Sequence, residues 1–178
     1  MNIAYLNGEF LPLDQAKISP LDRGFLFGDG IYEVIPTYNS RAVGLNGHLR
    51  RLHDGLAAIG ITSPMPRTQW EAMIAELVAR NTASQADGNV GVYIQVSRGA
   101  DSKRHHAYPN GVTPTIFAFT MAIPAPPTAD RVTAKGYRVA LEQDQRWQRC
   151  HIKSTSLLGN VMHYQTGSAG GVDETILF

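Results

Sequence analysis

The hydrophobic residues of this chain follow two different repeats, and this feature constrains the fold most. The segments 3–6 and 9–11 are strand-like runs separated by Asn7-Gly8, a residue pair typical of a two-residue type I′ hairpin turn. From His48 onward the apolar residues instead recur every three or four positions, as on one face of a helix that ends near Gly60: Leu49, Leu52, Leu56 and Ile59. A chain with both repeats is neither all-helical nor all-strand, and an α+β fold is predicted.

The sequence also predicts further strands and a second helix. A second hairpin is predicted at 32–38 and 41–45 with its turn at Asn39-Ser40, and the Gly-rich segment 19–30 before it is expected to be irregular. Thr68-Gln69-Trp70-Glu71 is a capping box that opens a helix, and strands are predicted at 90–96 and 115–121. Together these elements predict a small N-terminal α/β domain over residues 1–122.

The proline-dense stretch 123–129 divides the chain in two. Proline-rich segments form stiff extended spacers, so an interdomain linker is predicted there. Residues 130–178 then contain a predicted strand at 137–141, a helix from about Leu157, and a strand from Thr175 that continues to Phe178 without a turn. Because this part is smaller than an ordinary domain, we expect 130–178 to be the incomplete beginning of a larger C-terminal domain, and the chain to be part of a longer protein.

Composition argues against several classes of protein. Hydrophobic residues make up 43% and the formal net charge is +1, so a disordered chain is not expected. The near-balance of 16 Lys and Arg against 15 Asp and Glu gives no electrostatic case for a nucleic-acid or anionic-membrane partner. No apolar run approaches the roughly 18 residues that cross a bilayer, and Met1 is not followed by the pattern of a secretion signal. Cys150 is the single cysteine, which favours a reducing, cytoplasmic location.

Lysine is scarce, and one lysine has an unusual setting. The chain has Lys17, Lys103, Lys135 and Lys153, and Lys153 lies between a predicted strand and a predicted helix, among hydroxylic and apolar neighbours. Partial desolvation there would lower the pKa of its amine and free it for Schiff-base chemistry. The ordinary alternative is an exposed surface lysine.

Further side chains could bind anions. Arg51 follows His48 by three residues on one face of the first predicted helix, and could bind a phosphate or be solvated or ion-paired. Arg104 and His106 lie in a polar loop that could bind a carboxylate or be a charged hairpin tip. Because the adjacent residues His105 and His106 rarely converge on one ion, and no Cys or carboxylate cluster accompanies them, no metal site is predicted.

Four segments, taken together, resemble one enzyme family. They span 22–34, 48–52, 104–109 and 149–161, and include Asp22-Arg23-Gly24 through Glu33-Val34 and Arg149-Cys150-His151-Ile152-Lys153. In content and order they resemble the fold-type IV (class IV) pyridoxal-phosphate aminotransferases, most closely the D-alanine or D-amino acid aminotransferases. The resemblance implies a two-domain fold with pyridoxal 5′-phosphate as cofactor.

The same resemblance assigns roles to individual residues. It implies that Lys153 holds the cofactor as a Schiff base and carries the Cα proton of the substrate. It implies that Arg51 binds the cofactor phosphate, and that Tyr32, Arg104 and His106 bind the substrate α-carboxylate, the last two from the neighbouring subunit of a homodimer. The implied reaction is ping-pong transamination of D-alanine or D-glutamate with 2-oxoglutarate or pyruvate.

Other functions are open to the same fold, and one residue that the family needs is not found in this sequence. The same fold also supports branched-chain and (R)-amine transaminases and aminodeoxychorismate lyase, and a truncated, non-catalytic interaction protein is the alternative outside enzymes. Members of the family continue for roughly 100 residues more, about the length of a domain. The acidic partner of the pyridine nitrogen is expected in that stretch, because Glu174, the last carboxylate here, resembles a structural position.

Overall fold

The computed structural model describes residues 2–82, 88–126 and 128–178, which form two compact units. The first unit comprises the chain up to Ala125 together with Ile152–Thr155, and the second comprises Pro126–His151 and Ser156–Phe178. The short return of 152–155 to the first unit was not predicted. The domain boundaries at 1–122, 123–129 and 130–178 stay a prediction, and residue 127 of the predicted linker lies outside the described residues.

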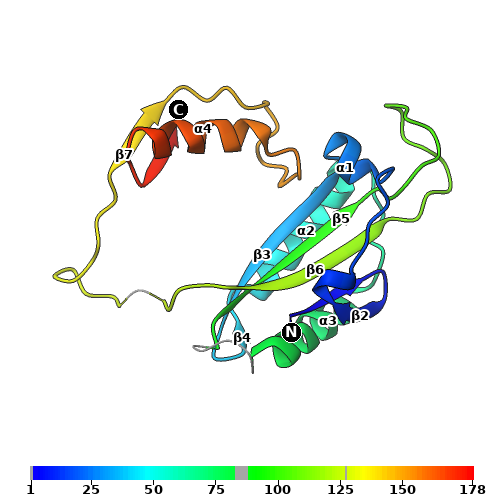
Figure 1. The fold of residues 1–178 in the computed structure, drawn as a ribbon, viewed down its shortest axis with the longest axis horizontal. Coiled ribbons are helices and arrows are strands. Elements are labelled where there is room, and N and C mark those ends of the chain that lie inside the picture. Colours follow the sequence, from blue (N-terminus) through cyan, green and yellow to red (C-terminus); the bar gives the residue numbers. More distant parts are fainter. Residues whose placement is uncertain (1, 83–87, 127) are drawn as a thin grey trace. The chain divides into compact units, whose positions relative to one another are not determined.

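The first unit is built on a six-stranded antiparallel sheet with the strand order β2-β1-β6-β5-β3-β4 (Figure 1). The strands are β1 (Ile3–Leu6), β2 (Glu9–Pro12), β3 (Gly30–Tyr38), β4 (Arg41–Ala42), β5 (Val90–Ser97) and β6 (Thr115–Ala122). The hairpin turn predicted at Asn7-Gly8 is confirmed, since both residues have positive φ values of 49° and 107°. β5 and β6 agree with the predicted strands within one residue.

Helices cover one face of this sheet. α2 (Leu45–Ala58) lies against β3, and α3 (Arg67–Thr82) packs on β1, β5 and β6 (Figure 1). Leu49, Leu52 and Leu56 of the predicted apolar stripe are buried, whereas Ile59 lies just past the end of α2 and is partly buried. The stripe meets Ile31 and Ile35 of β3 in a common core with Trp70. Fully burying one Ile or Leu side chain stabilises a fold by about 1.5–3 kcal/mol. Successive side chains of β3 point to opposite faces of the sheet. Its odd-numbered residues lie in the core, and Tyr32 lies on the opposite face.

Three local predictions were wrong. α3 begins at Arg67, so Thr68 lies inside the helix instead of capping it, and Glu71 binds Arg67. β4 ends at Ala42 rather than at residue 45, because Gly44 adopts a left-handed conformation with φ 66° and α2 begins directly after it. The segment 19–30 is not wholly irregular, since it contains the short helix α1 (Arg23–Phe27). The Asp22 carboxylate accepts a hydrogen bond from the Gly24 N–H at 2.7 Å and caps the start of α1. A 3-10 helix, Leu13–Gln15, is the remaining short element before it.

The second unit contains a parallel strand pair and one helix. β7 (Val139–Glu142) and β8 (Glu174–Leu177) are joined through α4 (Leu158–Ala169). All three elements were predicted within about two residues. A parallel pair requires such a crossover, and right-handed βαβ units are the usual solution. Across the parts of the chain that the structure describes, no helix has the length and apolar character needed to cross a membrane.

Candidate functional site

The lysine segment completes a free edge of the sheet. β3 pairs with β5 along its length, but its other edge is paired with β4 only at Thr37 and Tyr38. Residues 152–155 add to this edge: the Tyr32 N–H donates to the Lys153 carbonyl at 3.0 Å, and the Thr155 N–H donates to the Gly30 carbonyl at 3.0 Å. Ile152 is buried in the core and anchors the segment. The backbone of Lys153 is thereby fixed beside Tyr32.

The Lys153 amine lies over an aromatic ring. Its Nζ atom is 3.9 Å from the centre of the Tyr32 ring, and the residue is partly buried. Among the residues that the structure describes, no carboxylate forms an ion pair with Lys153. A ring face attracts the charged ammonium group, so this contact holds the Lys153 side chain in place without an anion. The structure therefore places Lys153 against Tyr32 rather than freely in solvent.

Tyr32 belongs to a row of aromatic side chains on the sheet face opposite α2 and α3. Its ring stacks on Tyr93 with centroids 5.7 Å apart, and Tyr93 in turn contacts Phe119 at 5.2 Å. Burial, and secondarily Tyr32, raises the pKa of Tyr93 to about 12, so its hydroxyl stays protonated and donates to Gln95. The Tyr32 ring under the Lys153 amine is thus supported by further aromatic side chains.

Arg51 is held by a buried carboxylate that was not among the predicted site residues. Glu33 on β3 is 1% exposed and accepts hydrogen bonds from Arg51 Nε at 2.5 Å, from Arg51 Nη2 at 2.8 Å and from His48 Nδ1 at 2.8 Å. Burial by itself would raise the pKa of Glu33, but the hydrogen bonds from Arg51 and His48 outweigh it and lower that pKa. Glu33 is therefore ionised, and His48 carries its proton on Nδ1.

This arrangement leaves part of the Arg51 guanidinium available. The bonds to Glu33 occupy Nε and Nη2, whereas Nη1 makes no hydrogen bond within the described part of the chain, and 51% of the side chain is exposed. The hydrogen bonds that Arg51 donates to Glu33 are the main cause that raises the pKa of Arg51, and Tyr32 adds a smaller electrostatic effect. The exposed part of the Arg51 guanidinium can bind an anion. The two predicted alternatives for Arg51, an ion pair and anion binding, do not exclude each other, because they use different nitrogens of the guanidinium.

Glu33 should make stability depend on pH. Its pKa is lower in the folded chain than in the unfolded chain, so its contribution is present at neutral pH and is lost as pH falls below about 5. We expect urea unfolding of the parent to show a lower free energy at pH 4 than at pH 7. Glu33→Gln should be less stable than the parent at pH 7, but its free energy of unfolding should fall less than that of the parent between pH 7 and pH 4. An equal fall in the free energy of unfolding of both proteins would contradict the assignment of this pH dependence to Glu33.

Arg104 and His106 meet at a different place in the first unit. The guanidinium of Arg104 is 5.1 Å from the centre of the Phe27 ring on α1, and the His106 ring is 5.3 Å from the same ring. Both side chains are exposed, as is His105. Among the contacts of the described residues, none joins Arg104 or His106 to Lys153. The structure therefore brings Lys153 into contact with Tyr32 and brings Arg104 and His106 together at Phe27, whereas Arg51 is joined through Glu33 to β3 and not to Lys153 by any contact among the described residues.

Glu33 and Asp29 are the functional candidates that the sequence did not reveal. Glu33 left a signal, because it is an acidic residue at a buried position of an otherwise apolar strand face. Asp29 left none, since Arg23 comes from the adjacent helix α1 and Arg98 is brought to it by the pairing of β3 with β5. In the ranges that the structure describes, no group of three or more His, Cys, Asp or Glu residues is placed to hold a metal ion.

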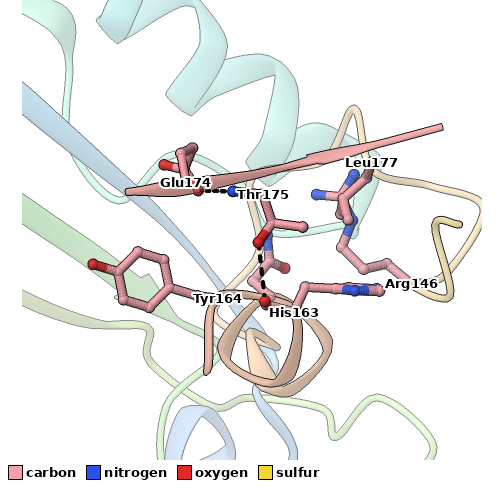
Figure 2. Close-up of a pocket in the computed structure, with 7 residues that line it drawn as sticks. Arg146, His163, Tyr164, Glu174, Thr175 and Leu177 are labelled. Carbon is pink, nitrogen blue, oxygen red and sulfur yellow. Dashed lines mark hydrogen bonds between the residues drawn. The ribbon is translucent and has the colours of Figure 1, made fainter. Parts of the chain in front are cut away.

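A pocket of about 410 Å³ lies in the second unit, over α4 and β8 (Figure 2). The Thr175 N–H donates to Glu174, and the Thr175 hydroxyl donates to the His163 carbonyl, as Figure 2 shows. His163 also contacts Glu142 at 2.6 Å. Several polar groups of this pocket are therefore already hydrogen-bonded within the second unit, and the pocket contains none of the predicted site residues. We place the candidate site at β3 instead.

An antiparallel sheet with helices on one face and a lysine segment on the edge of β3 defines the class of this protein. The chain belongs to the class IV aminotransferases, because the family model for amino-transferase class IV matches residues 30–178. It is 37% identical over 171 residues to a D-alanine aminotransferase of Bacillus licheniformis, covering 96% of this chain and 58% of the relative. A D-alanine aminotransferase of Listeria monocytogenes is 36% identical, over 88% of this chain and 53% of the relative.

Solved structures agree on the fold. A hypothetical aminotransferase from Mycobacterium tuberculosis, in its PLP-bound form, superposes with a TM-score of 0.76 at 20% identity, over 98% of this chain and 61% of that one. A branched-chain aminotransferase from the archaeon Thermoproteus uzoniensis gives 0.74 at 20% identity, over 99% and 59%. The predicted fold-type IV architecture is therefore confirmed. The chain spans between 53% and 61% of the length of these four relatives.

Proposed function

We propose that this protein is a pyridoxal-phosphate-dependent aminotransferase that acts on D-amino acids, with D-alanine or D-glutamate as donor and pyruvate or 2-oxoglutarate as acceptor. The observation that carries the proposal is the Lys153 amine, fixed over Tyr32 without a carboxylate partner among the described residues. The relatives named D-alanine aminotransferase support the substrate class. The likeness to structures at 20% identity supports the fold alone.

The side chains present suit pyridoxal phosphate. Lys153 supplies a primary amine for a covalent bond to the cofactor aldehyde, and Arg51 supplies a guanidinium with a free Nη1 for its phosphate. Glu33 and His48 hold Arg51 in place before any anion binds. The bound cofactor would supply an electron sink for the carbanion at the substrate Cα. Lys153, Tyr32 and Arg51 all belong to the first unit, so one compact body presents them.

Lys153 has two tasks in this proposal. It would hold the cofactor through Nζ, and as a free amine it would take the proton from the substrate Cα and later give that proton up again. Nζ lies above the Tyr32 ring, and among the described residues no carboxylate pairs with it. Two half-reactions at a single lysine give ping-pong kinetics.

Stereochemistry depends on where the substrate carboxylate is bound. We propose that Tyr32 binds it together with Arg104 and His106, the latter two supplied by the neighbouring subunit of a homodimer. The position of Arg104 and His106 at Phe27, without contacts to Lys153 among the described residues, is compatible with that arrangement. The cytoplasmic location stays a prediction.

The substrate class can be tested with a panel of amino acids. Both enantiomers of alanine, glutamate and valine are incubated with the protein, pyridoxal phosphate and a 2-oxo acid acceptor. Turnover of D-alanine or D-glutamate and not of their L-enantiomers is expected. Preferential turnover of L-valine would instead assign a branched-chain transaminase, and binding of no cofactor would favour a non-catalytic protein.

Arg104 should affect substrate recognition without affecting the cofactor. A charge-assisted hydrogen bond to a carboxylate contributes about 1.5–3 kcal/mol, so Arg104→Ala should raise the KM for a D-amino acid roughly ten- to hundredfold. Its affinity for pyridoxal phosphate should match that of the parent in an absorbance titration. Lys103→Ala, which changes the preceding exposed residue, is the matched control. Identical kinetics in Arg104→Ala and the parent would remove Arg104 from the site.

A further inference from the structure

Three buried charges next to the candidate site have no role in the function proposed so far. Arg23 and Arg98 are 3% and 7% exposed, and both bind the carboxylate of Asp29, whose side chain is 11% exposed. Arg23 Nε and Arg98 Nε each lie 2.8 Å from Asp29 Oδ2, and Arg98 Nη2 lies 3.0 Å from Oδ1. Burying charged groups is costly unless they are paired, so this cluster needs an explanation.

Arg23 connects Asp29 to the loop that carries Arg104 and His106. While its Nε binds Asp29, its Nη1 donates to the His105 carbonyl at 2.6 Å and its Nη2 donates to the His106 carbonyl at 3.1 Å. All three nitrogens of one guanidinium are therefore used, and two of them hold the backbone of consecutive loop residues. A rigid planar group fixes direction as well as distance.

Arg98 fastens the same loop a few residues further on. The ring of Tyr108 lies over the Arg98 guanidinium, 3.6 Å from ring centre to Cζ. Arg98 is itself held by Asp29 and by the carbonyls of Ile59 at 2.7 Å and Gly60 at 3.4 Å. A guanidinium with so many partners cannot reorient without breaking several bonds, so it provides a fixed base for Tyr108.

Asp29 is also joined to the lysine segment. It lies between Gly28 and Gly30, whose carbonyls accept hydrogen bonds from the Thr155 hydroxyl at 3.0 and 3.3 Å. Thr155 is two residues from Lys153 in the segment that adds to the edge of β3. The backbone of 28–30 is thus shared between the cofactor lysine and the ion cluster.

We propose that Asp29 is a positioning residue that, through Arg23 and Arg98, fixes the 104–108 loop so that Arg104 and His106 can bind the substrate carboxylate. This inference rests on the proposed function, because it assigns Asp29 to the recognition step of that reaction. Arg104 and His106 are exposed, and apart from their packing on Phe27 the orientation of their side chains depends on the loop backbone. Asp29 acts on the substrate only through that backbone.

Conservative variants can separate positioning from general stability. Asp29→Asn keeps the shape and removes the charge, which leaves two buried guanidinium groups without a carboxylate between them. Asp22→Asn is the matched control: Asp22 is also buried and lies on the same segment, but it binds the Gly24 N–H and the Thr115 hydroxyl and not the loop. Arg23→Lys keeps the charge but cannot bind Asp29 and both carbonyls together, and it replaces Asp29→Asn if that variant does not fold.

The first readout does not need activity. Lys103 and Arg104 are exposed trypsin sites within the loop, and cleavage of a native chain follows the population of its open form. We expect Asp29→Asn to be cleaved there about tenfold faster than the parent, while Asp22→Asn and cleavage at Arg67 and Arg80 on α3 stay unchanged. Equal cleavage in Asp29→Asn and the parent overturns the inference.

The second readout is kinetic. Asp29→Asn should raise the KM for D-alanine about tenfold or more, with its affinity for pyridoxal phosphate and its rate with an amine that lacks a carboxylate within about twofold of the parent. Faster loop cleavage with an unchanged KM for D-alanine overturns the inference. So does an equal loss of rate with D-alanine and with the amine that lacks a carboxylate. A parent that binds no pyridoxal phosphate overturns the proposed function instead, and the cleavage rate still decides whether Asp29 holds the loop.

Discussion

Lys153→Ala should abolish transamination and the yellow colour that bound pyridoxal phosphate gives the protein. The variant loses both the covalent attachment point and the group that moves the Cα proton. Proton transfer by a positioned side chain alone is worth about 10²–10⁴-fold in rate, so activity should fall by at least that factor. The absorption spectrum with added cofactor and the rate with D-alanine measure the two effects separately.

The fold should tolerate this change. Lys153 forms no ion pair within the described ranges, and its anchoring bonds to β3 come from its backbone and from Thr155. Lys153→Ala should therefore unfold in urea at nearly the same midpoint as the parent. Lys135→Ala, which removes an exposed lysine, should keep both colour and rate. Retention of colour and rate in Lys153→Ala would disprove its role.

Arg51→Ala should weaken both the fold and the binding of phosphate. Removing one partner of a fully buried ion pair typically costs 3–5 kcal/mol, but Arg51 is half exposed and Glu33 keeps its hydrogen bond from His48, so we expect a smaller loss of about 1–2 kcal/mol. Urea unfolding at pH 7 measures this loss. Arg50→Ala is the matched control, since the neighbouring Arg50 is exposed and makes no contact with Glu33 among the described residues.

The effect of Arg51 on the ligand can be separated from its effect on stability. Pyridoxal lacks the phosphate, so Arg51→Ala should lower the affinity for pyridoxal phosphate roughly ten- to hundredfold and leave the affinity for pyridoxal within about twofold. Equal losses for the two ligands would mean that Arg51 shapes the site only through Glu33. Unchanged binding of pyridoxal phosphate would remove Arg51 from the cofactor site.

Periodic patterns allowed most of the first unit to be predicted from sequence. The Asn7-Gly8 turn, the apolar stripe of α2, and the strands β5 and β6 each follow from a local rule. α1 was missed because its glycines suggested a loop, although Asp22 in front of it is a common N-cap residue. The return of 152–155 to the edge of β3 could not be predicted, since that pairing joins residues more than 100 positions apart.

The candidate site was less accessible from sequence than the fold. Lys153, Arg51, Tyr32, Arg104 and His106 were named through the family resemblance, because each residue alone has a more ordinary interpretation. What the structure adds is their surroundings: Glu33 explains how Arg51 is oriented, and Tyr32 explains how the Lys153 amine is held. These contacts join separate elements, so no local pattern in the sequence predicts them.

Chemical trapping of the cofactor on its lysine tests the central claim most directly. The protein is mixed with pyridoxal phosphate and reduced with borohydride, which fixes a lysine-bound cofactor irreversibly, and the digested chain is analysed by mass spectrometry. We predict a phosphopyridoxyl group on the peptide that contains Lys153 and none on the peptides that contain Lys17, Lys103 or Lys135. A modified lysine elsewhere, or no modification of Lys153, would contradict the account.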